Sequence, residues 1–355
     1  MTTPKARAAA FCARFGLRLP ILMAPMAGAS PASLAVAVSN AGGMGAGGML
    51  TMQPAAIAAW SAAFRAGSNG AFQLNTWIPD PAPLRDAAHE ARVRAFLGQF
   101  GPDVPAAAGD AALVDFAAQC AAMLAARPSV ISSIMGLYPP EFAAAIRAAG
   151  IAWFANVTTV AEALAAEAAG ADVVVAQGSE AGGHRGAFVA GDAERAAVGL
   201  FALLPAVVDA VKIPVIATGG VADARGIAAA LMLGASAVQI GTGLLRTPEA
   251  RLAPAWAAAL ATTRPEDTMI TRAFSGRAGR GIATDYTRAA ATGPAPAPYP
   301  VQRGLTSGMR EAAASAGNVQ HMQAWAGQSA AMARAEPAAD LLRDLWATAS
   351  ALLGD

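Results

Sequence analysis

Charged side chains are scarce in this chain of 355 residues, where Asp, Glu, Lys and Arg together make up 14%. An average globular protein has about 25%. The 25 basic and 24 acidic residues nearly cancel, and the aromatic content is only 6%. Nucleic acids and anionic membranes attract proteins with an excess of basic residues, and single-stranded nucleic acids also stack on arrays of aromatic side chains. This chain has neither feature. We therefore expect neither a nucleic acid nor a membrane as a partner.

Cysteine is nearly absent as well, because the chain has only Cys12 and Cys120, far apart in the sequence. Two distant cysteines are typical of free buried thiols in a reducing compartment. No group of Cys and His residues has the spacing of a metal site. The sequence thus predicts no metal and a cytoplasmic location.

Two long stretches contain no charge at all, between Arg18 and Arg65 and between Arg225 and Arg246. A membrane-spanning helix needs about 20 mostly apolar residues, but prolines and glycines interrupt both stretches. We interpret them as buried strand–turn–helix units. Prolines also break the short apolar run that follows the basic N-terminus, which disfavours a signal peptide.

What the chain does contain is a rhythm of short apolar runs, each followed by turn or polar residues. Such runs predict buried strands. The eight predicted strands cover residues 21–26, 43–47, 71–75, 130–135, 152–157, 172–177, 214–219 and 237–242.

Segments of helical pattern separate these runs. Ser30 is expected to cap the first helix, with Pro31 at its first position. Glycines at 150, 170 and 234 stand where helices should end. The remaining predicted helices cover residues 54–64, 110–126, 140–149, 160–169, 198–211 and 223–233.

Strands that alternate with helices of 10–15 residues indicate parallel βαβ units, and eight such units favour an α/β fold of the (β/α)₈ barrel type. An open doubly wound sheet is the alternative. No G-x-G-x-x-G pattern opens a helix, so a dinucleotide-binding motif is not indicated.

The rhythm breaks late in the chain, at segments rich in Gly and Pro. We predict that residues 1–247 form the barrel and that a C-terminal helix within 319–355 closes it. Residues 248–318 are predicted to form a smaller lid subdomain, which lies over the barrel mouth and helps to form the substrate site.

The mouth of a barrel lies at the carboxyl ends of its strands, where the active sites of this fold are found. The strand predicted at 172–177 opens there onto a Gly-rich loop with His184. Only three histidines occur, and His184 alone has such a context. Imidazole exchanges protons near neutral pH, so we predict that His184 is catalytic.

Glycine turns also follow the last two predicted strands, at Gly219–Gly220 and at Gly241–Thr242. Backbone N–H groups at such turns form a phosphate site. Asn75 and Gln177 end two other strands, and their amides suit the pyrimidine edge of a flavin. This combination predicts FMN as the cofactor.

Several motifs stand in these places. They are Met23-Ala-Pro-Met-Ala-Gly28, Val38-Ser-Asn-Ala-Gly-Gly-Met-Gly45, Ala176-Gln-Gly-Ser-Glu-Ala-Gly-Gly-His-Arg-Gly186, Thr218-Gly-Gly220, Gln239-Ile-Gly-Thr242 and Trp325-Ala-Gly-Gln328. These motifs resemble those of the nitronate monooxygenase family, also known as 2-nitropropane dioxygenases, and in particular its class I members. The similarity spans nearly the whole chain.

The resemblance implies an FMN-containing barrel that oxidises alkyl nitronates with O₂ to a carbonyl compound and nitrite, and it implies a role in detoxification. His184 matches the active-site histidine, as a base or as a group that binds the nitronate; if protonated, it would attract the anion. The implied cofactor-binding positions are Ala24, Pro25, Met26, Asn75, Gln177, Gly182, Gly183, Gly219, Gly220, Gln239, Ile240, Gly241 and Thr242.

Other residues near these motifs are assigned to substrate binding, packing, surface charge or loop order. Tyr299 is assigned to the substrate site, whereas packing is favoured for Tyr138, Tyr286, Trp77 and Trp325. For Arg277 and Arg280 we favour surface charge over binding of an anion, and Glu180 would order its loop. In the fourth strand, Ile134 and Met135 stand where many class I members have a histidine or an aromatic residue.

Three other classes of function fit some of these features. An NAD(P)H:quinone reductase or a flavin-dependent enoyl-ACP reductase would share the flavin site. A non-catalytic FMN-binding protein and a phosphosugar enzyme without flavin are further alternatives. The sequence does not define which nitronate is used, whether neutral nitroalkanes react, whether NAD(P)H reduces the flavin, or whether the chain forms an oligomer.

Overall fold

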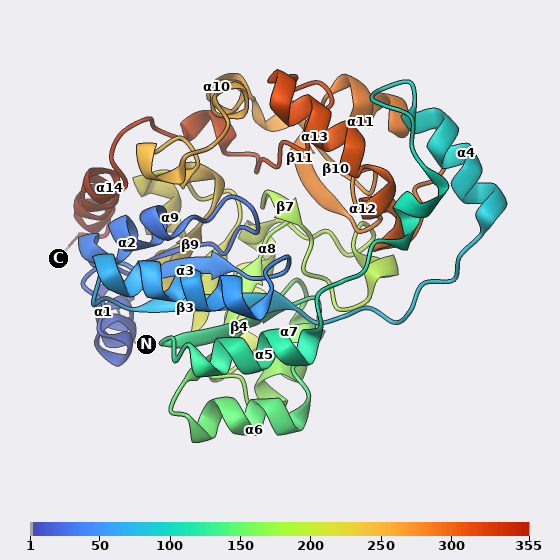
Figure 1. Ribbon diagram of the computed structural model, residues 1–355. Coiled ribbons are helices and arrows are strands. Elements are labelled where there is room, and N and C mark those ends of the chain that lie inside the picture. Colours follow the sequence, from blue (N-terminus) through green and yellow to red (C-terminus); the bar gives the residue numbers. More distant parts are fainter. Residues whose placement is uncertain (1–2, 355) are drawn as a thin grey trace.

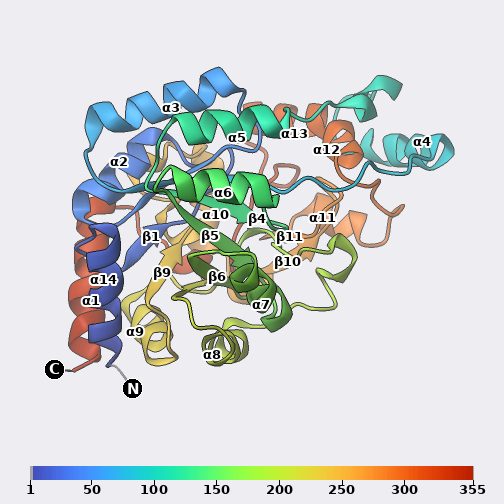
Figure 2. The same cartoon turned by 90° about the horizontal axis from the view of Figure 1, so that it is seen from below.

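The computed structural model describes residues 3–354 and shows eight parallel strands that form a barrel (Figures 1 and 2). The strands follow one another in the order β1-β9-β8-β6-β5-β4-β3-β2, and a bridge between Leu22 and Met44 joins the two ends. The predicted (β/α)₈ fold is confirmed, and the alternative of an open sheet is wrong. The strands are β1 Ile21–Met23, β2 Gly45–Gly48, β3 Phe72–Trp77, β4 Val130–Ile134, β5 Ala152–Val157, β6 Val173–Gln177, β8 Val215–Thr218 and β9 Ala237–Ile240.

Helices surround the barrel and cover its outer face, and their apolar sides pack on the strands. Helix α14 packs against α2 and α9, and its buried leucines join the core that these helices share. The helices of this layer are α1 Pro4–Phe15, α2 Ala32–Ala41, α3 Pro54–Gly67, α5 Phe116–Ala125, α6 Pro140–Ala148, α7 Val160–Ala168, α8 Leu200–Ala210, α9 Ala224–Met232 and α14 Ala338–Leu352.

Two of the local predictions at helix starts are wrong. Ser30 does not cap α2: its hydroxyl donates to Met26 O and accepts from Gly48 N, so it joins the loop after β1 to β2. The helix predicted from residue 110 begins only at Phe116, because the Asp115 side chain caps it there. Tertiary hydrogen bonds decide the first case and local capping decides the second.

Several predicted strands end earlier than expected. Residues 24–26 leave the ladder after β1 and run as a loop, whereas after β9 Gly241 leaves the ladder and Thr242 begins a short 3-10 helix. Ala24 N still donates to Ile240 O, which ties the starts of these two loops together. The loops therefore lie at the barrel mouth, where the backbone is free to meet a ligand.

The barrel interior changes from apolar to polar along the strands. At the amino-terminal end, the cluster that includes Leu22, Met44, Phe154 and Ile216 fills the interior, and Phe11 of α1 packs beneath it. Inward positions alternate along a strand. Two residues further along, Asn156 follows Phe154 and Thr218 follows Ile216, so these strands present polar side chains at the mouth.

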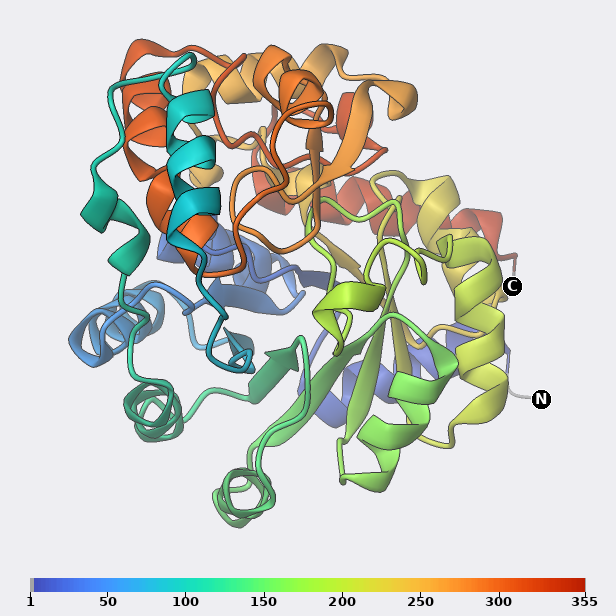
Figure 3. The same cartoon turned by 90° about the vertical axis from the view of Figure 1, so that its right-hand side faces the viewer.

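A second region packs over the mouth (Figures 1 and 3). Its core joins the late part of the chain to α4, which belongs to the insertion between β3 and β4. Leu97, Phe274, Tyr286 and Leu305 meet in this core. The elements are α4 Ala87–Leu97, α10 Pro254–Thr262, β10 Thr268–Thr271, β11 Gly279–Ile282, α11 Asp285–Ala290, α12 Val301–Leu305 and α13 Ser307–Ala316.

Across residues 3–354, none of the helices combines the length and the apolar character that crossing a membrane would require.

Candidate active site

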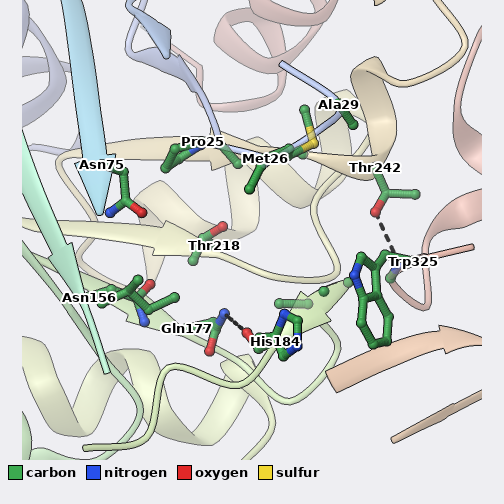
Figure 4. A pocket seen from close by; sticks show the side chains of 18 of the residues that line it. Pro25, Met26, Ala29, Asn75, Asn156, Gln177, His184, Thr218, Thr242 and Trp325 are labelled. Carbon is green, nitrogen blue, oxygen red and sulfur yellow. Dashed lines mark hydrogen bonds between the residues drawn. The ribbon is translucent and has the colours of Figure 1, made fainter. Parts of the chain in front are cut away.

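A cavity of about 400 Å³ opens at the carboxyl ends of the barrel strands, within the usual range of roughly 300–1,000 Å³ for small-molecule sites. The structure brings most of the predicted site residues together around it (Figure 4). The predicted residues that line it are Ala24, Pro25, Met26, Asn75, Gln177, Gly182, Gly183, His184, Gly219, Gly220, Gln239, Gly241 and Thr242.

Two predicted residues lie elsewhere. The Ile240 side chain belongs to the core between the strands and the surrounding helices, because side chains of adjacent strand residues point to opposite faces. Tyr299 does not line the main cavity. It borders a smaller hollow, and its ring centroid lies 5.3 Å from the ring centroid of Trp77.

Amide side chains on the strands form the floor of the cavity. Gln73 Nε2 donates to Met23 O and to Gln239 Oε1, at 3.1 and 3.0 Å. Asn75 Nδ2 donates to the backbone and side-chain oxygens of Ser132. These bonds fix the amides on several strands before any ligand binds.

Two buried polar atoms in this floor have no hydrogen-bond partner among the described residues, namely Gln73 Oε1 and Asn156 Nδ2. A buried polar atom without a partner costs free energy. One acceptor and one donor on the cavity wall therefore fit a ligand that offers both, as the edge of a flavin ring does.

A glycine turn follows β8 at the cavity wall. Gly219 and Gly220 have φ of +107° and +70°, a conformation that side chains disfavour. A Cβ on Gly219 would lie 3.1 Å from Ala181 N and Gly178 O. The amide groups of both glycines find no acceptor within residues 3–354, so they are free to bind an anion.

The loop after β9 completes this side of the cavity. Thr242 Oγ1 accepts a hydrogen bond from Gly327 N, 3.0 Å away. A Cβ on Gly182 would lie only 2.5 Å from Gly327 N. The Gly182 loop, Thr242 and the Gly327 segment therefore touch, which requires glycine at the point of contact.

His184 extends from the barrel into the three-stranded sheet of the region that packs over the mouth. It lies in the short strand β7 (Gly183–His184), which pairs antiparallel with β11, so that His184 faces Gly279. The imidazole stands edge-on to Trp77 and Trp325, with ring centroids 4.6 and 4.8 Å away. Its Nε2 lies 2.7 Å from Ser275 Oγ.

The environment of His184 strongly favours the neutral ring. Burial, together with the nearby cations Arg277, Arg303 and Arg310, lowers its pKa from the ordinary 6.5 to about 3. The ring is neutral at physiological pH and can accept a proton or a hydrogen bond. The positive charge that we attributed to a protonated His184 must come from elsewhere.

Two pocket residues on α12 and α13 supply that charge. Arg303 and Arg310 line the cavity. Arg310 binds Thr306 Oγ1, Gln323 Oε1 and Arg303 O, none of them a carboxylate. The guanidinium of Arg303 has no hydrogen-bond partner in the described part of the chain, and its charge helps to lower the pKa of Arg310. The arrangement fits an anionic ligand.

Arg277 and Arg280 are buried, so the interpretation as surface charges is wrong. Arg277 pairs with Asp80 through Nε and Nη2, and its Nη1 donates to Ala187 O. Arg280 donates to Ser179 O and to Thr268 Oγ1. Both guanidiniums connect the region over the mouth to barrel loops instead of facing solvent.

The loop that carries His184 is held by polar side chains. Gln177 Nε2 donates to His184 O, and Gln177 Oε1 accepts from Gly186 N (Figure 4). Glu180 accepts from Leu200 N at the start of α8, which agrees with a role in ordering the loop. The Gln177 amide thus orients the loop that carries His184.

The aromatic residues divide into two groups. Tyr138 and Tyr286 pack in buried clusters, as expected. Trp77 and Trp325 line the cavity, so the expectation that they only pack is wrong. Ile134, the last residue of β4, lines the cavity, whereas Met135, which follows the strand, is buried and does not line it.

The sequence analysis missed several lining residues, and some left a signal. Gln73 lies two residues before Asn75, and Asn156 is the single amide in β5; the alternation of strands could have placed both at the mouth. No comparable signal existed for Arg303 and Arg310, because packing of the lid subdomain brings them to the cavity.

Within residues 3–354 no three His, Cys, Asp or Glu side chains are grouped as a metal ion would require.

Comparison with known proteins points to one family. A family model described as nitronate monooxygenase matches residues 10–348. The nitronate monooxygenase of Pseudomonas aeruginosa is 39% identical over 94% of this chain and 97% of its own length. The corresponding figures for the nitronate monooxygenase of Paraburkholderia phytofirmans are 38%, 93% and 92%.

Solved structures give the same result for the fold. The nitroalkane oxidase of Streptomyces ansochromogenes superposes with a TM-score of 0.85 at 37% identity, over 94% of this chain and 96% of that chain. FabK from Thermotoga maritima superposes with a TM-score of 0.75 at 26% identity, over 97% and 96%.

Proposed function

Because the chain belongs to the nitronate monooxygenase family, we propose that it is an FMN-dependent enzyme that oxidises alkyl nitronates. In the proposed reaction a nitronate and O₂ give a carbonyl compound and nitrite. His184, at the cavity wall between Trp77 and Trp325, is the observation that carries the assignment.

The residues present fit FMN. The unpaired atoms Gln73 Oε1 and Asn156 Nδ2 match a ring edge with a donor and an acceptor. The free amides of Gly219 and Gly220 match a phosphate. When bound, FMN would supply the transfer of electrons from the nitronate to O₂, whereas the protein binds and orients.

The charges of the cavity suit a nitronate better than a neutral nitroalkane. A nitronate is already deprotonated, and the uncompensated Arg303 and Arg310 attract its negative charge. Neutral His184 adds no charge of its own and keeps a lone pair on one ring nitrogen. For a neutral nitroalkane the same ring would have to remove a proton as a general base.

The most direct test mixes the purified protein anaerobically with ethylnitronate, and separately with NADH or NADPH, while flavin absorbance is recorded. The proposal predicts bound FMN, bleaching by the nitronate and no fast bleaching by either nicotinamide. Fast reduction by nicotinamide without a response to nitronate would instead establish a quinone reductase or an enoyl-ACP reductase. A colourless protein that takes up no added FMN would contradict the flavin assignment.

The His184→Asn variant separates an enzyme from a non-catalytic flavin protein. General acid–base catalysis contributes roughly 10²–10⁴-fold to rates. Turnover of nitroalkanes should fall by a factor in this range, while FMN stays bound. His89→Asn is the matched control, because His89 lies on α4 and does not line the cavity.

A cytoplasmic location and a role in detoxification belong to the same proposal.

A further inference from the structure

His184 has one hydrogen-bond partner for its ring, and that partner comes from the lid subdomain. Ser275 lies between β10 and β11, is 1% exposed, and places its Oγ 2.7 Å from His184 Nε2. Nδ1 of the ring makes no hydrogen bond with any residue from 3 to 354. The serine contact therefore decides how the ring proton is placed.

The other contacts of Ser275 determine the direction of this bond. Its hydroxyl donates to Arg277 O at 3.2 Å and accepts from Arg277 N at 3.3 Å. A serine has a single hydroxyl proton. If it went to His184 Nε2, the buried carbonyl of Arg277 would lose its donor. All these groups are satisfied only when His184 donates Nε2–H to Ser275.

We propose that Ser275 is a positioning residue, which holds neutral His184 as the Nε2–H tautomer and leaves the Nδ1 lone pair free to accept a proton from a nitroalkane. Its relevance to nitronate chemistry rests on the proposed function. The tautomer itself follows from the hydrogen bonds alone. A lid residue thus sets which nitrogen of a barrel residue acts on the ligand.

The turn that carries Ser275 is held firmly in place. Gly276 N donates to Arg272 O at 2.8 Å, and a Cβ on Gly276, with φ of +88°, would lie 2.5 Å from Tyr299 N. Next to it, the Arg277 guanidinium is paired with Asp80 and bonded to Ala187 O. The hydroxyl therefore has a fixed position to which the imidazole must conform.

The charged groups around the ring agree with a neutral histidine. Arg277 approaches from the turn of Ser275, and Arg303 and Arg310 approach from α12 and α13. No carboxylate contributes to the shift of the His184 pKa. No anion beside the ring stabilises a second proton, so the ring is neutral. Its single proton then lies on either Nε2 or Nδ1.

The experiment is ¹⁵N NMR of the purified full-length protein with labelled histidine, because long-range correlation spectra distinguish protonated from unprotonated ring nitrogens. Only three histidines contribute, so His89 and His321 serve as internal references. At pH 7 we expect His184 to carry its proton on Nε2. A proton on Nδ1 in the unmodified protein would overturn the proposal without any variant.

Variants then test the role of the hydroxyl. In Ser275→Ala the His184 signals should shift toward a mixture of tautomers, and kcat with a nitroalkane should fall at least tenfold with a smaller change in KM. Ser275→Thr, which keeps the hydroxyl, should restore both. An unchanged tautomer together with unchanged kcat in Ser275→Ala would refute the proposal.

Ser307→Ala is the matched control, since Ser307 lies on α13 of the lid subdomain and donates only to Gly304 O. It should leave the tautomer and kcat as they are. If Ser275→Ala does not fold, the spectrum of the unmodified protein and the Ser275→Thr variant still decide the matter. If the His184 tautomer changes with the Ser275 variants as expected but the protein does not oxidise nitronates, the proposed function is refuted and the positioning role of Ser275 stands.

Discussion

At the scale of single residues, the positive charge of the site resides in Arg303 and Arg310, which form no salt bridge with a carboxylate in the described part of the chain. Replacing Arg303 by Met removes a charge from the cavity wall but keeps an unbranched side chain. We expect KM for a nitronate to rise roughly tenfold, which corresponds to about 1.4 kcal/mol, with a smaller effect on kcat. Steady-state kinetics would measure this.

Arg288→Met is the control for this variant, because Arg288 is exposed on α11 and does not line the cavity. Equal KM values for Arg303→Met, Arg288→Met and the unmodified enzyme would remove Arg303 from substrate binding. The same Arg303 variant should also raise the pKa of His184, since the charge of Arg303 helps to lower it.

The depressed pKa of His184 predicts a pH dependence of stability with a definite sign. Between about pH 3 and 6.5 the unfolded chain binds a proton at His184 that the folded chain does not bind. The contribution of this group to stability is therefore complete above pH 6.5 and is lost as the pH falls toward 3. Urea denaturation at several pH values would detect it.

His184→Asn is the comparison for that series, because asparagine does not titrate. The free energy of unfolding of the unmodified protein should fall more steeply below pH 6.5 than that of the variant. Parallel slopes for the two proteins would mean that the His184 pKa is not depressed.

Because His184 does not titrate near pH 6.5 in the folded protein, we also expect no change in kcat/KM with a midpoint near that pH.

At the scale of elements, the turn after β8 depends on glycine. Ala at position 219 would have to adopt φ of +107° and approach Ala181 N and Gly178 O at 3.1 Å. Either the turn or its amide groups must move. We expect Gly219→Ala to weaken FMN binding at least tenfold, as measured by titration of apoprotein with FMN under flavin fluorescence.

Gly191→Ala provides the control, since a Cβ there would meet nothing within 4 Å. It should bind FMN as the unmodified protein does. An unaltered affinity in Gly219→Ala would show that this turn does not hold the cofactor phosphate.

The same scale shows how far sequence patterns reach. Apolar runs located the strands, since a strand buried on both faces must be apolar over most of its length. Their carboxyl ends were misjudged at residues 24–26 and 241–242, because leaving the ladder depends on neighbouring loops. Asp115 as the true helix start was a local signal that the alanine-rich pattern obscured.

At the scale of the whole molecule, α14 joins the end of the chain to its beginning by packing on α2 and α9. Leu342 is fully buried in that contact. Leu342→Ala should lower the free energy of unfolding by about 2–5 kcal/mol, the range for large-to-small changes in a core. Chemical denaturation followed by circular dichroism would give the value.

Leu352→Ala, on the same helix but 57% exposed, should change stability by less than about 0.5 kcal/mol. A similar small effect at both positions would mean that α14 adds little to the stability of the barrel.

The sequence by itself determined the barrel, the carboxyl-end location of the site and the glycine turns, because periodicity and glycine content are local properties of the chain. It also singled out His184 as the histidine in a Gly-rich loop. Only the tertiary structure decided the charge and orientation of that ring. Arg277, Arg303, Arg310 and Ser275 lie far from it in sequence, and burial and electrostatic fields act through space.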